Sequence, residues 1–308
     1  MVIQAFFFLC RQRFRHQGTN QAKTSWPLCP FVTSECRKPE TLSSRYTAID
    51  FLMASSKLYF TVMCCLRHHS DAIALPDSAA LPLNASTWVI DEKLYENRVD
   101  GVREPTSDPD EQPSGWEAKY LCHNHHFPYN QAFMRVYCQG PDEGTEFLLP
   151  EVRAQQANPH FEKQEAKARK KFRQGGCKSV PSLLGYGQSV QGEHGPVPGG
   201  YITYLVWEKV RGQVLTPKLF WSFERPKRDL VRRKFRAAYE EMSSFGWGPG
   251  GENITKIIWD KESADLWISG FRGSYPTDEK WEDCILAYYC LIKPPASGVC
   301  ENLDEWEW

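Results

Sequence analysis

The sequence predicts an α+β domain in which β-strands precede most of the helices. Short apolar runs typical of strands gather between residues 120 and 210, and the longest segment with a 3.6-residue period follows them. Of the 308 residues, 41% are hydrophobic and 24% are charged, which is ordinary for globular proteins. The chain is therefore long enough to bury a sizeable core.

The N-terminal third carries few structural signals. Residues 1–79 show no sustained hydrophobic period and no paired helix start and stop signals, so we expect a poorly ordered segment. Residues 80–114 are expected to be a linker with one short element, Ser86–Asn97. An acidic, proline-containing stretch, REPTSDPDEQPSG, ends this linker.

Four apolar segments read as strands. Tyr120–Cys122 is expected to be the end of one strand, and Ala132–Gln139 (AFMRVYCQ) is expected to be another. Val180–Gly185 and Tyr201–Val210 follow, and the second of these is a nearly continuous apolar run of the buried type. A loop rich in glycine and proline, Gly187–Gly200, separates them.

A helix is expected between these strands, over Pro159–Gln174, and the pair Gly175-Gly176 ends it. One face of this helix carries side chains at i, i+4, i+7 and i+11, namely Phe161, Glu165, Ala168 and Phe172.

The last third predicts two helices and a hairpin. Pro226–Phe245 holds a 3.6-residue apolar period over its whole length, with charged residues on the other side. Ile254–Trp259 and Asp265–Ile268 flank a polar turn and read as a hairpin. A final helix is expected over Asp278–Leu291.

Five segments together resemble the eukaryotic protein-kinase fold. The likeness covers about residues 115–290 and is closest to the small, degenerate kinase-like proteins abundant in filamentous fungi. It implies a two-lobed fold, with a small β-rich lobe at residues 115–210 and a shortened helical lobe at residues 211–308. The segments are AFMRV at 132–136, FEKQEAKARKKF at 161–172, VPSLLGY at 180–186, LVWEKVRG at 205–212 and the block at 245–273 that ends in ISGFRG.

The resemblance places a nucleotide cleft on the small lobe. In kinases a strand lysine pairs with the nucleotide phosphates and with a helix glutamate. Arg135 and Glu165 match these two positions, so we predict that their side chains form an ion pair. Phe133 stands where a small residue makes room for adenine, and it would fill that space. The backbone of Glu208 to Val210, at the hinge position, would still hydrogen-bond an adenine. The alternative is a surface arginine on an ordinary strand and a glutamate in water.

The resemblance also implies that the catalytic residues are missing. No G-x-G-x-x-G precedes Arg135. Gly251 matches the catalytic aspartate, Lys256 the metal-binding asparagine and Gly270 the metal-binding aspartate. Phosphoryl transfer needs positioned Mg²⁺ and an aspartate that orients the attacking hydroxyl. We therefore expect no catalytic residue, no metal ligand and no cofactor other than ATP bound without metal.

Three hypotheses for function follow. The first is a catalytically impaired kinase-like (pseudokinase) domain that acts as a binding or scaffold module for a protein partner. The second is an atypical ATP-dependent protein kinase or phosphotransferase whose acidic groups are Asp260, Asp265 or Glu252. A carboxylate that faces the cleft near Arg135 would favour the second. The third is a decayed sequence without a retained function.

Charge and hydropathy exclude several classes of function. A net charge of −1 and a pI of about 6.7 argue against nucleic-acid binding. No stretch reaches about 18 consecutive apolar residues, so no transmembrane segment is expected. The 11 cysteines form no C-x-x-C pair, and reduced thiols are expected in an intracellular protein, cytoplasmic or nuclear.

Two local clusters are given structural interpretations. Cys122, His123, His125 and His126 lie too close in sequence to supply a full tetrahedral shell, so a polar loop is expected rather than a metal site. The basic run Lys167–Lys171 is expected to be the exposed face of its helix.

Overall fold

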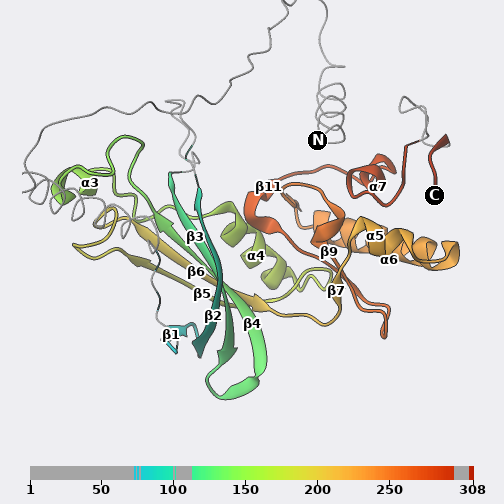
Figure 1. Ribbon diagram of the computed structural model, residues 1–308, viewed down its shortest axis with the longest axis horizontal. Coiled ribbons are helices and arrows are strands. Elements are labelled where there is room, and N and C mark those ends of the chain that lie inside the picture. Colours follow the sequence, from blue (N-terminus) through green and yellow to red (C-terminus); the bar gives the residue numbers. More distant parts are fainter. Residues whose placement is uncertain (1–72, 74, 76–77, 100, 102–112, 295–304) are drawn as a thin grey trace, which may run out of the picture. The chain divides into compact units, whose positions relative to one another are not determined.

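The computed structural model describes residues 73, 75, 78–99, 101, 113–294 and 305–308. Over these residues the protein is a mixed α+β structure with a large β-sheet and few helices, as the sequence predicts (Figure 1). Its first part contains β1 (Ala80–Leu83), β2 (Ser86–Val99), β3 (Gly115–Asn124), β4 (Phe127–Gln139), α3 (Pro150–Ala154), α4 (Gln164–Gly175), β5 (Leu183–Val190) and β6 (Tyr201–Glu208).

The elements after β6 are shorter, with the exception of one long helix. They are β7 (Gln213–Val214), α5 (Pro217–Trp221), α6 (Arg225–Ser243), β8 (Trp247–Gly248), the 3₁₀ turn η1 (Ile254–Lys256), β9 (Ile257–Trp259), β10 (Leu266–Ile268), the 3₁₀ turn η2 (Phe271–Gly273), β11 (Tyr275–Pro276) and α7 (Cys284–Tyr288).

The first six strands form one sheet in the order β1-β2-β3-β4-β6-β5, and every neighbouring pair is antiparallel. Strands β3 and β4 form a hairpin, and the chain then passes through α4 before it returns to the sheet as β5 and β6 (Figure 1). Because β6 lies between β4 and β5, the strand before α4 and the strand after it are not neighbours.

The sheet buries apolar side chains on both faces, because alternate residues of a strand point to opposite sides. One face forms a cluster of Ile73, Leu83, Trp88, Ile90, Ala118, Tyr120, Cys122, Ala132, Met134, Val136, Cys138 and Val206. The face toward α4 forms a second cluster of Tyr137, Phe161, Ala166, Leu183, Tyr201, Leu205 and Trp207.

Helix α6 organises the second half of the chain. It packs against β10, which belongs to a small sheet of order β10-β9-β7. Its N-terminal Pro226 needs no hydrogen-bond partner at that position. The apolar stripe expected from the sequence is buried and consists of Val231, Phe235, Ala238, Tyr239 and Met242.

The segment between residues 80 and 99 is not a linker. The short element expected at Ser86–Asn97 is the strand β2, and Ala80–Leu83 forms β1 of the same sheet. Ile73, in the segment expected to be poorly ordered, is buried, and its carbonyl oxygen accepts a hydrogen bond of 2.8 Å from Tyr120 Oη. Residues 1–72 and most of the acidic stretch lie outside the described residues.

Three expected boundaries are wrong. Helix α4 begins at Gln164 rather than Pro159, because Lys163 has extended backbone angles. Strand β5 begins at Leu183 rather than Val180, since Pro181 cannot donate to a strand ladder. The final helix is only Cys284–Tyr288, because Cys290 takes a left-handed φ of 55° that ends it. None of the helices that the structure describes is long and apolar enough to cross a membrane.

Candidate functional site

Strand β4 and helix α4 place two charged side chains against each other. Alternation along β4 puts Arg135 and Tyr137 on the face that packs against α4. On α4, Glu165 and Arg169 are four residues apart and therefore lie on the same side of the helix. Glu165 is in the first turn, where the helix dipole favours a negative charge.

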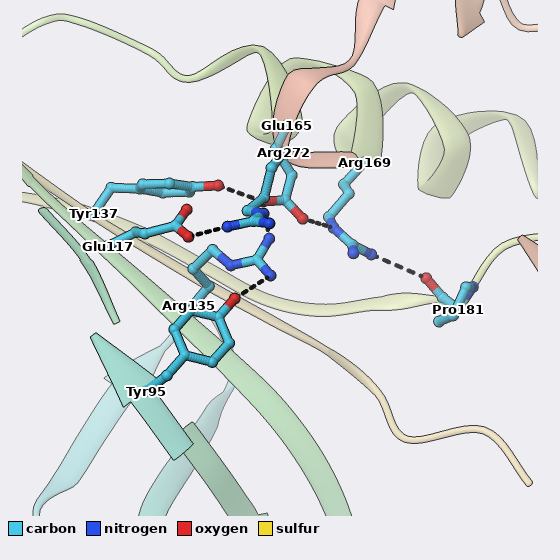
Figure 2. Close-up of polar contacts among 8 residues, drawn as sticks. All are labelled: Tyr95, Glu117, Arg135, Tyr137, Glu165, Arg169, Pro181 and Arg272. Atoms are coloured by element: carbon cyan, nitrogen blue, oxygen red, sulfur yellow. Dashed lines mark hydrogen bonds and ion pairs between the residues drawn. The ribbon is translucent and has the colours of Figure 1, made fainter. Parts of the chain in front are cut away.

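Glu165 is fully buried and accepts hydrogen bonds from three side chains (Figure 2). Its Oε2 lies 2.5 Å from Arg135 Nη1 and 2.6 Å from Tyr137 Oη. Its Oε1 accepts a hydrogen bond of 2.8 Å from Arg169 Nε. The predicted ion pair between Arg135 and Glu165 is confirmed, and it belongs to a larger network than the sequence suggested.

The network stabilises the charged form of Glu165. Burial by itself would raise the pKa of this carboxyl group, but the charges of Arg135 and Arg169 and the hydrogen bonds from Tyr137 and Arg169 outweigh it and lower the pKa to about 2. Burial by itself would lower the pKa of the Arg135 guanidinium, but the charge of Glu165 outweighs this effect and raises the pKa above its ordinary value. Burial lowers the pKa of Arg169, which still remains protonated at neutral pH.

Aromatic side chains support the buried arginines. The guanidinium carbons of Arg135 and Arg169 lie 5.0 and 4.4 Å from the ring centroid of Trp207. Tyr95 Oη accepts a hydrogen bond of 3.2 Å from Arg135 Nη2. These cation–π contacts and hydrogen bonds offset part of the cost of removing two positive charges from water.

A second buried carboxylate lies beside this network. Glu117 on β3 is 3% exposed and forms an ion pair with Arg272 of η2 (Figure 2). Glu117 pairs in register with Tyr137 of β4, whose hydroxyl donates a hydrogen bond to Glu165. The pair therefore joins the sheet to a segment 155 residues further along the chain.

Lys119 completes the charged face of the sheet. It pairs in register with Arg135, and its Nζ lies 3.8 Å from the ring centroid of Phe133. Burial, followed by the charge of Arg135, lowers the pKa of Lys119 to about 8. Phe133 lies against Lys119, and its ring centroid is 6.1 Å from that of Trp207.

Sequence reasoning missed several residues of the network. The basic run Lys167–Lys171 was expected to be exposed, but Arg169 is buried because it lies one turn after Glu165 on the inward face. Glu117 and Lys119 were missed because only the end of β3 was recognised. The alternation of charged and apolar residues from Glu117 to Cys122 was the signal that could have found them.

Glu208 and Val210, the two expected hinge residues, lie at the end of β6 and beyond it. Glu208 is exposed at the end of β6 and lines a cavity of about 320 Å³ together with Arg169, Pro181 and Trp267. Its backbone N–H donates to Ser182 O at 2.9 Å, so this donor is already occupied. Val210 is half-buried beyond the strand end.

The three positions that the resemblance matched to kinase catalytic residues differ in their surroundings. Gly251 is exposed, with a φ of 71° and no atom within 4 Å of the place where a Cβ would be. Gly270 has a φ of 87°, and a Cβ there would lie 2.4 Å from Lys256 Cδ. The side chain of Lys256 therefore lies against Gly270.

The acidic residues weighed for the alternative hypothesis have other surroundings. Asp260 accepts the backbone N–H of Glu262 at 2.9 Å in the turn between β9 and β10, and Asp265 is exposed at the end of this turn. Glu252 lies near Tyr289. Burial is the main cause of the raised pKa of Tyr289, and the charge of Glu252 contributes to it. The carboxylates close to Arg135 are instead Glu117 and Glu165.

The cysteine and the histidines of the β3–β4 hairpin do not lie on one face of the sheet. Cys122 points into the apolar cluster, while His123 Nδ1 on the opposite face lies 2.6 Å from Asp91. His125 and His126 follow at the turn with their rings edge to face. Among the described residues, no three His, Cys, Asp or Glu side chains come together as a metal site would require.

Comparisons with known proteins add little to this geometry. A scan against protein families finds no match, and neither does a search of the curated proteins. Among solved structures, the kinase PK-1 of Cydia pomonella granulovirus is similar at 10% sequence identity and a TM-score of 0.34. The alignment covers 61% of this chain and 55% of that kinase, so the chain spans about half of its length. A likeness this weak bears on neither activity nor ligand.

Proposed function

We propose that this protein is a kinase-like binding module that does not transfer phosphate. The observation that carries the proposal is the buried pair between Arg135 on β4 and Glu165 on α4. Kinases hold a lysine and a glutamate in the same relation, on a strand and on the next long helix. Arginine keeps the positive charge, although its planar fork differs from a compact ammonium.

The loss of catalysis follows from the three degenerate positions. Gly251 and Gly270 have no side chain that binds a metal or orients a hydroxyl, and Lys256 repels Mg²⁺. Catalysis of phosphoryl transfer is almost entirely positioning and charge stabilisation, so each missing contact removes orders of magnitude in rate. What remains is a folded domain whose role is to bind a ligand or a protein partner.

The alternative is an atypical phosphotransferase that uses a carboxylate outside the standard positions. Glu117 is the residue that favours this possibility, because it lies on the strand next to Arg135 and close to Arg272. Its carboxylate, however, is already held in an ion pair with Arg272. We therefore place the alternative second.

The test is phosphate transfer from γ-labelled ATP by the purified full-length chain, with Mg²⁺ or Mn²⁺. The acceptors are the protein itself and a basic test protein. We expect no transfer above the level of two variants, Glu117→Gln and Arg135→Ala, whose folding is checked by near-UV circular dichroism. The proposal fails if the wild type transfers phosphate and a folded variant does not. Traces that persist equally in both variants indicate a contaminating kinase.

A further inference from the structure

Basic side chains from five elements lie in or beside the network of Arg135 and Glu165. They are Lys119 of β3, Arg135 of β4, Arg169 of α4, Lys256 of η1 and Arg272 of η2. Lys119 pairs in register with Arg135, Arg169 donates to Glu165, Arg272 forms an ion pair with Glu117, and Lys256 lies against Gly270, two residues before Arg272. Their charges act on one another. Burial is the largest cause of the lowered pKa of Lys119, and the charges of Arg135, Arg169 and Arg272 lower it further. Burial, followed by the charges of Arg272 and Arg135, also lowers the pKa of Lys256. A folded domain keeps such mutual repulsion at a cost in stability, and such costs are typical of binding sites.

The two carboxylates of this cluster, Glu117 and Glu165, are already paired with arginines. The ammonium groups of Lys119 and Lys256 differ from these arginines in their partners. Neither Nζ has a hydrogen bond or ion pair with any residue that the structure describes. With five basic and two acidic side chains, the cluster has an excess of three positive charges, and two of these are on the lysines. The side chain of Arg272 is 47% exposed, so the cluster opens to solvent on one side.

Lys256 occupies the space of the missing metal-binding side chain. Its aliphatic stem lies where a Cβ at Gly270 would be, with Cδ 2.4 Å from that position. The backbone N–H and hydroxyl of Ser269 donate to the carbonyl oxygen of Lys256 at 2.8 and 3.0 Å, and hold the two segments together. An aspartate at position 270 would therefore require the Lys256 side chain to move, so the aliphatic stem of Lys256 depends on a glycine at this position.

We propose that Lys119, Lys256 and Arg272 bind the phosphate chain of a polyphosphate ligand directly, without a divalent metal ion. The ammonium of Lys256 supplies the positive charge that a metal would otherwise bring to the phosphates. A metal-bound phosphate chain carries less negative charge and brings a cation toward Lys256, so it binds more weakly than the free chain. This inference rests on the proposed function, since it assumes that the cleft binds and does not catalyse.

The test is isothermal titration of the full-length chain with inorganic tripolyphosphate and with ATP, each with excess EDTA and with excess Mg²⁺. The variant Lys256→Met removes the charge but keeps a stem of similar length against Gly270. The matched control is Lys261→Met, which removes an exposed lysine from the neighbouring β9–β10 turn. Thermal melts verify that both variants are folded.

We expect tripolyphosphate to bind in EDTA, Mg²⁺ to weaken binding, and Lys256→Met to weaken it about tenfold while Lys261→Met leaves it unchanged. The inference is overturned if Mg²⁺ strengthens binding, if both lysine variants behave alike, or if ATP binds and tripolyphosphate does not. Absence of binding by both ligands also overturns it. None of these results affects the proposed function, which depends on the phosphate-transfer assay alone.

Discussion

Replacing Glu165 with glutamine removes the negative charge from the centre of the buried network. Arg135 and Arg169 have side chains that are 8% and 3% exposed, and both donate to this carboxylate. Glutamine has a similar shape but leaves the two guanidinium groups buried without a counter-charge. Breaking a buried ion pair in this way typically costs about 3–5 kcal/mol of unfolding free energy.

The pKa of Glu165 leads to a similar magnitude. The difference between the ordinary value of 4.5 and about 2 corresponds to about 3 kcal/mol of stability. Because the pKa of the folded state is the lower one, this stability is present above pH 4.5 and is lost as the pH falls toward 2. The variant Glu165→Gln should lack this part of the acid sensitivity.

Thermal and urea unfolding at pH 7 measure the effect. For a domain of this size, about 3–5 kcal/mol lowers the melting temperature by about 6–20 °C. The matched control is Glu162→Gln, three residues earlier, whose ion pair with Lys170 is partly exposed at 26% and 34%. We expect the control to lose at most about 1 kcal/mol. Equal losses in the two variants would refute the claim that Glu165 is the charge centre of the network.

Three further substitutions test other parts of the structure. Ile73→Ala should cost about 2–5 kcal/mol in urea unfolding, because Ile73 is buried in the sheet cluster; a loss below 0.5 kcal/mol would contradict this packing. In thermal melts, Gly250→Ala should lower the melting temperature more than Gly251→Ala. A Cβ at 250 would lie 2.2 Å from the carbonyl carbon of Gly273, whereas a Cβ at 251 meets no atom within 4 Å. Only the left-handed φ opposes alanine at 251, at about 1–2 kcal/mol. Lys119→Met should raise the melting temperature at pH 7, because the folded pKa of about 8 lies below the ordinary 10.5 and the charged lysine opposes folding. This advantage should shrink as the pH rises from 8 to 10.5, and a difference that is constant with pH would argue against it.

The ion pair between Arg135 and Glu165 was predictable because both residues belong to regular local patterns. A period of two along β4 and a period of 3.6 along α4 define the inward faces, and these faces contain Arg135 and Glu165 among apolar residues. A charge on an apolar face needs a partner. The long helix α6 and the β9–β10 hairpin were predictable for the same reason, since their periods are continuous.

The rest of the site depends on contacts between distant parts of the chain. Arg169 lies one turn after Glu165, but its contact with Trp207 of β6 depends on the packing of α4 against the sheet. Strand β2 was expected only as a short element within a linker, and its pairing with β3 holds it in the sheet.

The sequence by itself determined the α+β class and the main helix faces. These properties follow from residue identity and from periods of a few residues, which local geometry converts into faces. Only the tertiary structure decided that Glu117 pairs with Arg272, and that Lys256 fills the space beside Gly270. The physical reason is that an electrostatic site depends on distances between charges, and folding alone brings together charges that are more than a hundred residues apart.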